Sequence, residues 1–137
     1  MGESLSYNGL KILIPGQWIN DGIINCTIKR FLDEAETPDC IKIVDTLFFN
    51  LIPWDQKAKK IVDYNVGQRF FKNIDIFKLE HLIFPINTED HWFVIFVIRP
   101  NMIIEWDRNG DTNFRIKAYC SLGLRNQDTV EKIAAII

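Results

Sequence analysis

The feature that most constrains the fold is an unbroken apolar run over residues 92–98, which reads Trp-Phe-Val-Ile-Phe-Val-Ile. Aromatic and β-branched residues dominate it, as they dominate β-strands. The run is far shorter than the roughly 18 apolar residues that span a bilayer. A strand with both faces covered shows such a continuous pattern. The run therefore predicts a buried strand in a central sheet.

The composition limits the number of domains and the classes of binding partner that the chain can have. The chain has 137 residues, 47% of them hydrophobic, which suits one domain with its own core. Sixteen Lys and Arg against eighteen Asp and Glu leave a net charge of −2. That near-balance argues against a nucleic-acid binder and against a polybasic membrane binder. We therefore expect no nucleic acid and no membrane as partners.

The cysteines and residues 1–8 indicate the cellular compartment of the protein. Cys26, Cys40 and Cys120 are widely spaced, and no CxxC pair occurs. We expect three reduced thiols, no metal site and no cofactor. Residues 1–8 lack the basic and apolar regions of a secretory signal. The expected location is intracellular.

Further strands are predicted around the central run. Residues 82–86 are apolar, and Pro85 among them favours a strand end or a sheet edge. Residues 41–44 and 102–106 also have strand character, and turn-forming residues follow the second of these. The sequence thus predicts a small sheet of about three or four strands.

Helices are predicted at both ends of the chain. Asn20 or Asp21 can cap a helix with one apolar face formed by Ile23, Ile24, Ile28, Phe31 and Leu32. Further helices are expected over 45–52, 61–71, 114–122 and 129–137. The fold class predicted is α+β, with a small mixed central sheet flanked by helices.

The last helix has an apolar stripe that continues to Ile137, whereas chain ends are usually polar and frayed. We therefore expect residues 1–137 to form a single domain that is truncated, and so incomplete, at its C-terminal side.

Two titratable residues flank the predicted central strands. His91 precedes the run 92–98, and Asp107 ends the stretch 102–106. Adjacent strands can bring an imidazole and a carboxylate together as a base and the group that orients it. A surface or hydrogen-bonding role is the alternative for His91, and His81 is a weaker candidate in a charged stretch. Trp18 and Trp92 could equally be core aromatics, and Asn20 with Asp21 could be only a helix cap.

Two longer motifs favour the catalytic interpretation. Residues 16–25 (Gly-Gln-Trp-Ile-Asn-Asp-Gly-Ile-Ile-Asn) closely resemble the W-L-N-D-x-I-I-N opening of the ubiquitin-like-protein-specific (SUMO) cysteine proteases, of the papain-like clan. Residues 84–92 resemble that family's P-I-N-x-x-x-H-W motif. Residues 45–49 look like its N-T-F-F segment, and residues 103–107 lie where its strand ends in the catalytic Asp, usually written Y-D-S. The motifs occur in family order over roughly residues 10–125.

The resemblance implies roles for these residues. His91 would be the general base and Asp107 its orienter. Trp18 and Trp92 would line a narrow tunnel for the substrate's Gly-Gly end, with Asn20 and Asp21 shaping the loop that carries Trp18. The implied reaction is thiol-dependent cleavage after the C-terminal Gly-Gly of SUMO or a related ubiquitin-like modifier, in the nucleus or cytoplasm.

One part of the family pattern is not found. The family nucleophile lies well after the Asp, in a Q-x-x-x-x-x-C-G stretch. Cys120 has Phe114 where that pattern needs Gln, and Ser121 where it needs Gly. The family has a helix in this region, so Cys120 is expected to be structural; Arg108 also replaces the usual Ser. The chain could be a fragment of a longer protease, a catalytically dead module that binds a modifier, or an unrelated domain or one with an unusual nucleophile. We expect no turnover by this chain alone.

Overall fold

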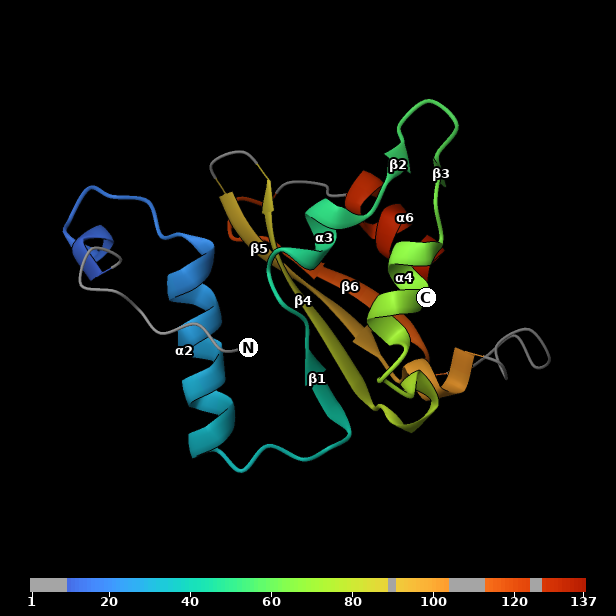
Figure 1. Cartoon of the computed structure of the whole chain (residues 1–137), viewed down its shortest axis with the longest axis horizontal. Coiled ribbons are helices and arrows are strands. Elements are labelled where there is room, and N and C mark those ends of the chain that lie inside the picture. Colours follow the sequence, from blue (N-terminus) through green and yellow to red (C-terminus); the bar gives the residue numbers. More distant parts are fainter. Residues whose placement is uncertain (1–9, 89–90, 104–112, 124–126) are drawn as a thin grey trace.

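The computed structural model describes residues 10–88, 91–103, 113–123 and 127–137 (Figure 1). Within these residues the helices are η1 (Lys11–Leu13), α2 (Asp21–Glu34), α3 (Phe48–Leu51), α4 (Asn65–Phe71), η2 (Ile76–Lys78), η3 (Pro100–Met102) and α6 (Gln127–Ile136). The strands are β1 (Ile41–Ile43), β2 (Trp54–Asp55), β3 (Lys60–Ile61), β4 (His81–Thr88), β5 (His91–Ile98) and β6 (Arg115–Tyr119).

The fold is α+β with a small mixed sheet, as the sequence predicts. Four strands lie in the order β1-β4-β5-β6, with β1 parallel to β4 and the other pairs antiparallel. Strands β2 and β3 form a separate short hairpin that the sequence does not predict. Its strands have two residues each, too few for an alternating pattern to show.

The core lies on one face of the sheet. Along β5 the side chains of Phe93, Ile95 and Val97 are buried, and they alternate with partly exposed residues. They pack in one cluster with buried residues of β4, with Phe48 of α3 and with Ile133 of α6. The strand 92–98 is thus confirmed, but only one of its faces is fully covered.

Pro85 lies within β4, where it pairs with Val94 of β5. Strand β1 pairs with β4 only as far as Ile83, whose carbonyl accepts a hydrogen bond from Val44. The backbone N–H and C=O groups of successive residues in a strand point to opposite sides. The backbone nitrogen of Pro85 therefore points toward the β1 side of β4, at a position beyond the last residue of β1. The missing N–H of proline therefore removes no bond to β1. The predicted strand end or sheet edge at Pro85 is therefore wrong, because β4 lies between β1 and β5 and continues to Thr88.

In the region before α6, one predicted element is wrong and another is wrong at its start. Met102 lies in the 3-10 helix η3, so the strand predicted over 102–106 does not include it, and residues 104–106 lie outside the described residues. The helix predicted over 114–122 is instead the strand β6, paired with β5. Ile116 and Cys120 both pack against the core. A separation of four residues puts two side chains on one face of a helix and also of a strand, so the spacing did not distinguish the two.

Helix α2 confirms the predicted start, because the Asn20 side chain accepts a hydrogen bond from the Ile23 N–H at 3.1 Å. Only Ile23 and Asn25 of this helix are buried, and Phe31 is 66% exposed. In Figure 1, α2 lies beside the edge of the sheet that β1 forms. The helix is therefore attached to the rest of the fold mainly through its first half.

Asn25 makes that attachment. Its Nδ2 donates to Asp45 at 3.2 Å, and its Oδ1 accepts from the Thr46 N–H at 3.2 Å. Asp45 and Thr46 follow β1, so one buried amide joins α2 to the end of this strand. The bonds explain why an asparagine ends the motif over residues 16–25.

The predicted helices 45–52 and 61–71 are shorter in the structure, where α3 begins at Phe48 and Ile61 belongs to β3. The C-terminal helix is confirmed as α6, with Ile133 and Ile136 buried. Among the described residues, no helix has the length and apolar character needed to cross a membrane.

Candidate active site

His91 lies at the start of β5, opposite Thr88 near the end of β4. Its side chain is partly buried, and its ring stacks with that of Phe93, with 6.3 Å between centroids. Side chains two residues apart in a strand share a face, so His91 continues the core face of β5 to the end of the sheet. The imidazole therefore lies on a strand that the core holds in place.

The partner of His91 in the structure is a cysteine. The Nε2 atom of His91 lies 3.0 Å from the Sγ atom of Cys120, the first residue after β6. The register pairs Tyr119 with Val94, which places Cys120 across from Phe93 and diagonal to His91 on the same face. The expectation that Cys120 lies in a helix, apart from the site, is wrong. The contact depends on the pairing of β6 with β5, which no local motif reveals.

Asp107 and Arg108 lie outside the described residues. The role of Asp107 as orienter therefore stays a prediction. Among the described residues, no three His, Cys, Asp or Glu side chains are grouped so as to hold a metal ion.

The two sequence motifs meet in space. The indole Nε1 of Trp92 donates a hydrogen bond to the carbonyl of Ile19 at 2.9 Å, across 73 positions of sequence. This bond holds the loop before α2 against the start of β5, one residue from His91. Trp18, on the same loop, is 72% exposed.

Asn20 and Asp21 occupy the junction between this loop and α2. Asn20 caps the helix, as described above, and Asp21 is its first residue. One carboxylate oxygen of Asp21, Oδ1, is buried and has no hydrogen-bond partner among the described residues. The structure thus places Trp18, Asn20 and Asp21 on one continuous segment, which Trp92 joins to the strand that carries His91.

Comparison with known proteins places this arrangement in a class. The chain shares its fold with a protein whose structure is described as the crystal structure of the de-sumoylating protease. The TM-score is 0.76 at 18% sequence identity, over 96% of this chain and 49% of that one. The fold is thus that of a de-sumoylating protease.

Residues 17–137 match the Ulp1 protease family, C-terminal catalytic domain, and the chain belongs to that family. It is 32% identical to human sentrin-specific protease 5 over 111 residues, which are 81% of this chain and 14% of the relative. It is 23% identical to ubiquitin-like-specific protease 2 of Saccharomyces cerevisiae over 117 residues, 84% of this chain and 11% of that protein. The chain thus spans a small part of these curated relatives.

Proposed function

We propose that this chain belongs to a cysteine-type peptidase that cleaves after the C-terminal Gly-Gly of SUMO or a related ubiquitin-like modifier. The reaction would mature precursors and release the modifier from conjugates in the nucleus or cytoplasm. The observation that carries the proposal is the hydrogen bond between Trp92 and the Ile19 carbonyl. It brings the loop with Trp18 next to the strand that begins with His91.

The chemistry of this junction suits a Gly-Gly end. Glycine has no side chain, so an extended Gly-Gly segment is thin enough to pass between aromatic walls that exclude other residues. Trp18 is largely exposed, and Trp92 is fixed by its bond to the carbonyl of Ile19. In this proposal the two indoles form the walls of the passage. In this proposal Asn20 and Asp21 hold the Trp18 loop at the start of α2.

His91 is the proposed general base. An imidazole at this position can take the proton of a cysteine thiol, which then attacks the glycyl carbonyl to form a thioester that water releases. Asp107 is the proposed orienter of His91, by the resemblance of residues 103–107 to the family pattern. A hydrogen bond from one ring nitrogen to Asp107 would hold the imidazole in one tautomer. In that tautomer the other ring nitrogen is free to accept a proton.

None of the three cysteines in these 137 residues is followed by glycine, so the family's Cys-Gly nucleophile is not among them. We therefore propose that the chain alone binds the modifier without turning it over. A fluorogenic amide at the modifier's C-terminus tests this point, because hydrolysis by the chain would release the fluorophore. Steady release that Cys120→Ser abolishes would show instead that Cys120 is the nucleophile.

The second candidate function is a catalytically dead module that only binds a modifier, and the same cysteine pattern favours it. The two candidates differ in His91. A peptidase base supports catalysis once the family nucleophile is present, whereas a binding module does not need the imidazole. Adding a Gln…Cys-Gly segment from an active relative should give His91-dependent cleavage for the first candidate and none for the second.

Binding itself is tested by calorimetric titration of the chain with SUMO. Two forms of SUMO are compared, one ending in Gly-Gly and one lacking both glycines. We expect Trp18→Ala to weaken binding of the Gly-Gly form about tenfold or more, which is the cost of removing a buried aromatic anchor. Phe31→Ala is the matched control, since Phe31 is similarly exposed on α2. Equal binding of the two SUMO forms, or equal effects of the two variants, would contradict the proposal.

A further inference from the structure

Cys120 is a thiol in direct contact with an imidazole, and the proposed function assigns it no role. We propose that Cys120 is a reactive thiol activated by His91, and that small disulfides such as glutathione disulfide modify it. The proposal rests on the contact and on the strand register that produces it. It needs neither the modifier nor the nucleophile of the family.

The first support is the contact. The separation of 3.0 Å between Cys120 Sγ and His91 Nε2 is short for a hydrogen bond that involves sulfur, whose atomic radius exceeds that of oxygen. A thiol with an imidazole in this position can pass its proton to the ring, and the thiolate is the nucleophilic form of cysteine.

The second support is the backbone. Cys120 follows β6 directly, and five register pairs join β6 to β5, from Ile98 with Arg115 to Val94 with Tyr119. After Cys120 the chain turns, and the Gly123 N–H donates to the Cys120 carbonyl at 3.0 Å. Gly123 has a φ of +65°, a conformation that glycine adopts without strain. Strand pairing on one side and a turn on the other therefore fix Cys120 beside His91.

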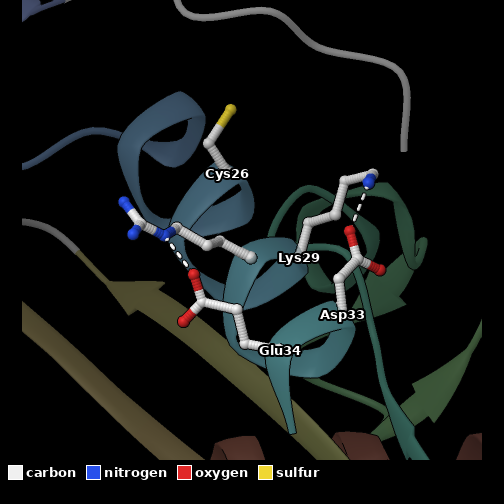
Figure 2. Close-up of a pocket in the computed structure, with 5 residues that line it drawn as sticks. Cys26, Lys29, Asp33 and Glu34 are labelled. Carbon is white, nitrogen blue, oxygen red and sulfur yellow. Dashed lines mark hydrogen bonds and ion pairs between the residues drawn. The ribbon is translucent and has the colours of Figure 1, made fainter. Parts of the chain in front are cut away.

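Cys26 offers an internal comparison. It lies on α2 near two cations, Lys29 and Arg30, and Figure 2 shows it in the surface pocket that these residues help to line. Each cation is held by a carboxylate: Lys29 by Asp33 and Arg30 by Glu34, both at 2.7 Å. Both cations near Cys26 thus pair with carboxylates, whereas Cys120 contacts a group that can accept its proton.

The reaction proposed is thiol–disulfide exchange. The Sγ proton of Cys120 passes to Nε2 of His91, and the sulfur attacks one sulfur of the disulfide. A new S–S bond to Cys120 forms as the old one breaks, and the leaving thiolate takes the proton back from the imidazolium. The products are a mixed disulfide on Cys120 and one free thiol, so no other oxidant is needed.

Modification would also affect His91. The mixed disulfide places a bulky group beside Nε2 and removes the thiol that contacts it. If His91 is the base of the proposed peptidase, this would block it, and that consequence rests on the proposed function. The reactivity of Cys120 does not.

The test uses two versions of the full chain with one cysteine each. Cys26→Ser with Cys40→Ser leaves Cys120, and Cys40→Ser with Cys120→Ser leaves Cys26. Each is treated with glutathione disulfide from pH 5.5 to 9, and the mixed disulfide is counted by intact mass. We expect the Cys120 chain to react about tenfold or more faster than the Cys26 chain at pH 6.5, because His91 can accept the thiol proton as the sulfur attacks.

His91→Gln in the Cys120 chain should remove that advantage, with folding checked by circular dichroism. A second measurement covers the case in which this variant does not fold. The ¹⁵N signal of His91 Nε2 should move when only Cys120→Ser is introduced. Equal rates for the two thiols, or an unchanged His91 signal, would overturn the proposal. No modifier enters these experiments, so their failure is separate from a failure of the SUMO titration.

Discussion

Strand β5 and helix α2 flank the candidate site, but they are held in different ways. Three side chains of β5, Phe93, Ile95 and Val97, are at most 6% exposed and lie in the core cluster. Helix α2 has fourteen residues, of which only Ile23 and Asn25 are buried. The proposed base thus lies on a rigid strand, while the proposed substrate loop leads into a lightly anchored helix. Such a division lets the loop adjust to a ligand without moving the base.

The largest effect should come from the strand. Ile95→Ala empties a fully buried position between β4 and β6, and we expect a loss of about 2–5 kcal/mol in the free energy of unfolding. Urea unfolding followed by circular dichroism measures it. Phe31→Ala on α2 should change stability by less than about 0.5 kcal/mol. Similar losses for both variants would mean that α2 is as firmly packed as β5.

A smaller loss of stability is expected at Asn25, which joins α2 to the end of β1. Asn25→Ala removes the bonds to Asp45 and Thr46 and leaves the Thr46 N–H buried without this acceptor, at a cost of about 1–3 kcal/mol. Hydrogen exchange should accelerate more in α2 than in β5. Asn50→Ala, at an exposed position of α3, is the control. Equal acceleration in both elements would show that Asn25 does not act as a local attachment.

A still smaller loss of stability is expected from a substitution at the start of α2. Asn20→Ala removes the cap on the Ile23 N–H and should cost about 1 kcal/mol, because that donor loses its acceptor. Asn20→Ser retains a capping oxygen and should recover most of the loss. Thermal unfolding of the three chains measures the difference. If serine is no better than alanine, the side chain of residue 20 stabilises the loop in another way.

The smallest effect is expected at an exposed contact away from both regions. Lys59 and then Gln56 donate to Asp128 of α6 and hold the pKa of its carboxyl below the usual value. A lowered carboxyl pKa adds stability above the unfolded value, and this is lost as the pH falls through the folded one. Asp128→Asn should therefore reduce the Tm slightly at pH 7 and not at pH 2, and added salt should shrink the difference. An equal reduction at both pH values would exclude the ionic origin.

The same contrast explains what the sequence could predict. β5 and α2 follow from local patterns, an unbroken apolar run in one and a capped apolar face in the other. Strand β6 does not follow from its local pattern, because the core-facing residues Ile116 and Cys120 are four positions apart, a spacing that fits both a helix and a strand. The secondary structure of this segment is decided by its pairing with β5, whose residues are distant in the sequence.

The candidate active site also has one part that the sequence predicts and one part that it does not. Family motifs direct attention to His91, Trp18 and Trp92, and their roles stay predictions. The contact between His91 and Cys120 could not be predicted, because it needs the register of β6 against β5. Asp107 lies outside the described residues, so its assignment depends on the resemblance alone.

The central claim is that the junction of the Trp18 loop with the start of β5 binds the Gly-Gly end of a modifier. NMR titration of the ¹⁵N-labelled chain with SUMO tests it most directly, by following the indole signals of Trp18, Trp92 and the remote Trp54. We expect the Trp18 and Trp92 signals to move with SUMO that ends in Gly-Gly, and to stay in place with SUMO lacking both glycines. The Trp54 signal should not move in either case. Shifts that do not depend on the glycines, or no shifts at Trp18 and Trp92, would contradict the account.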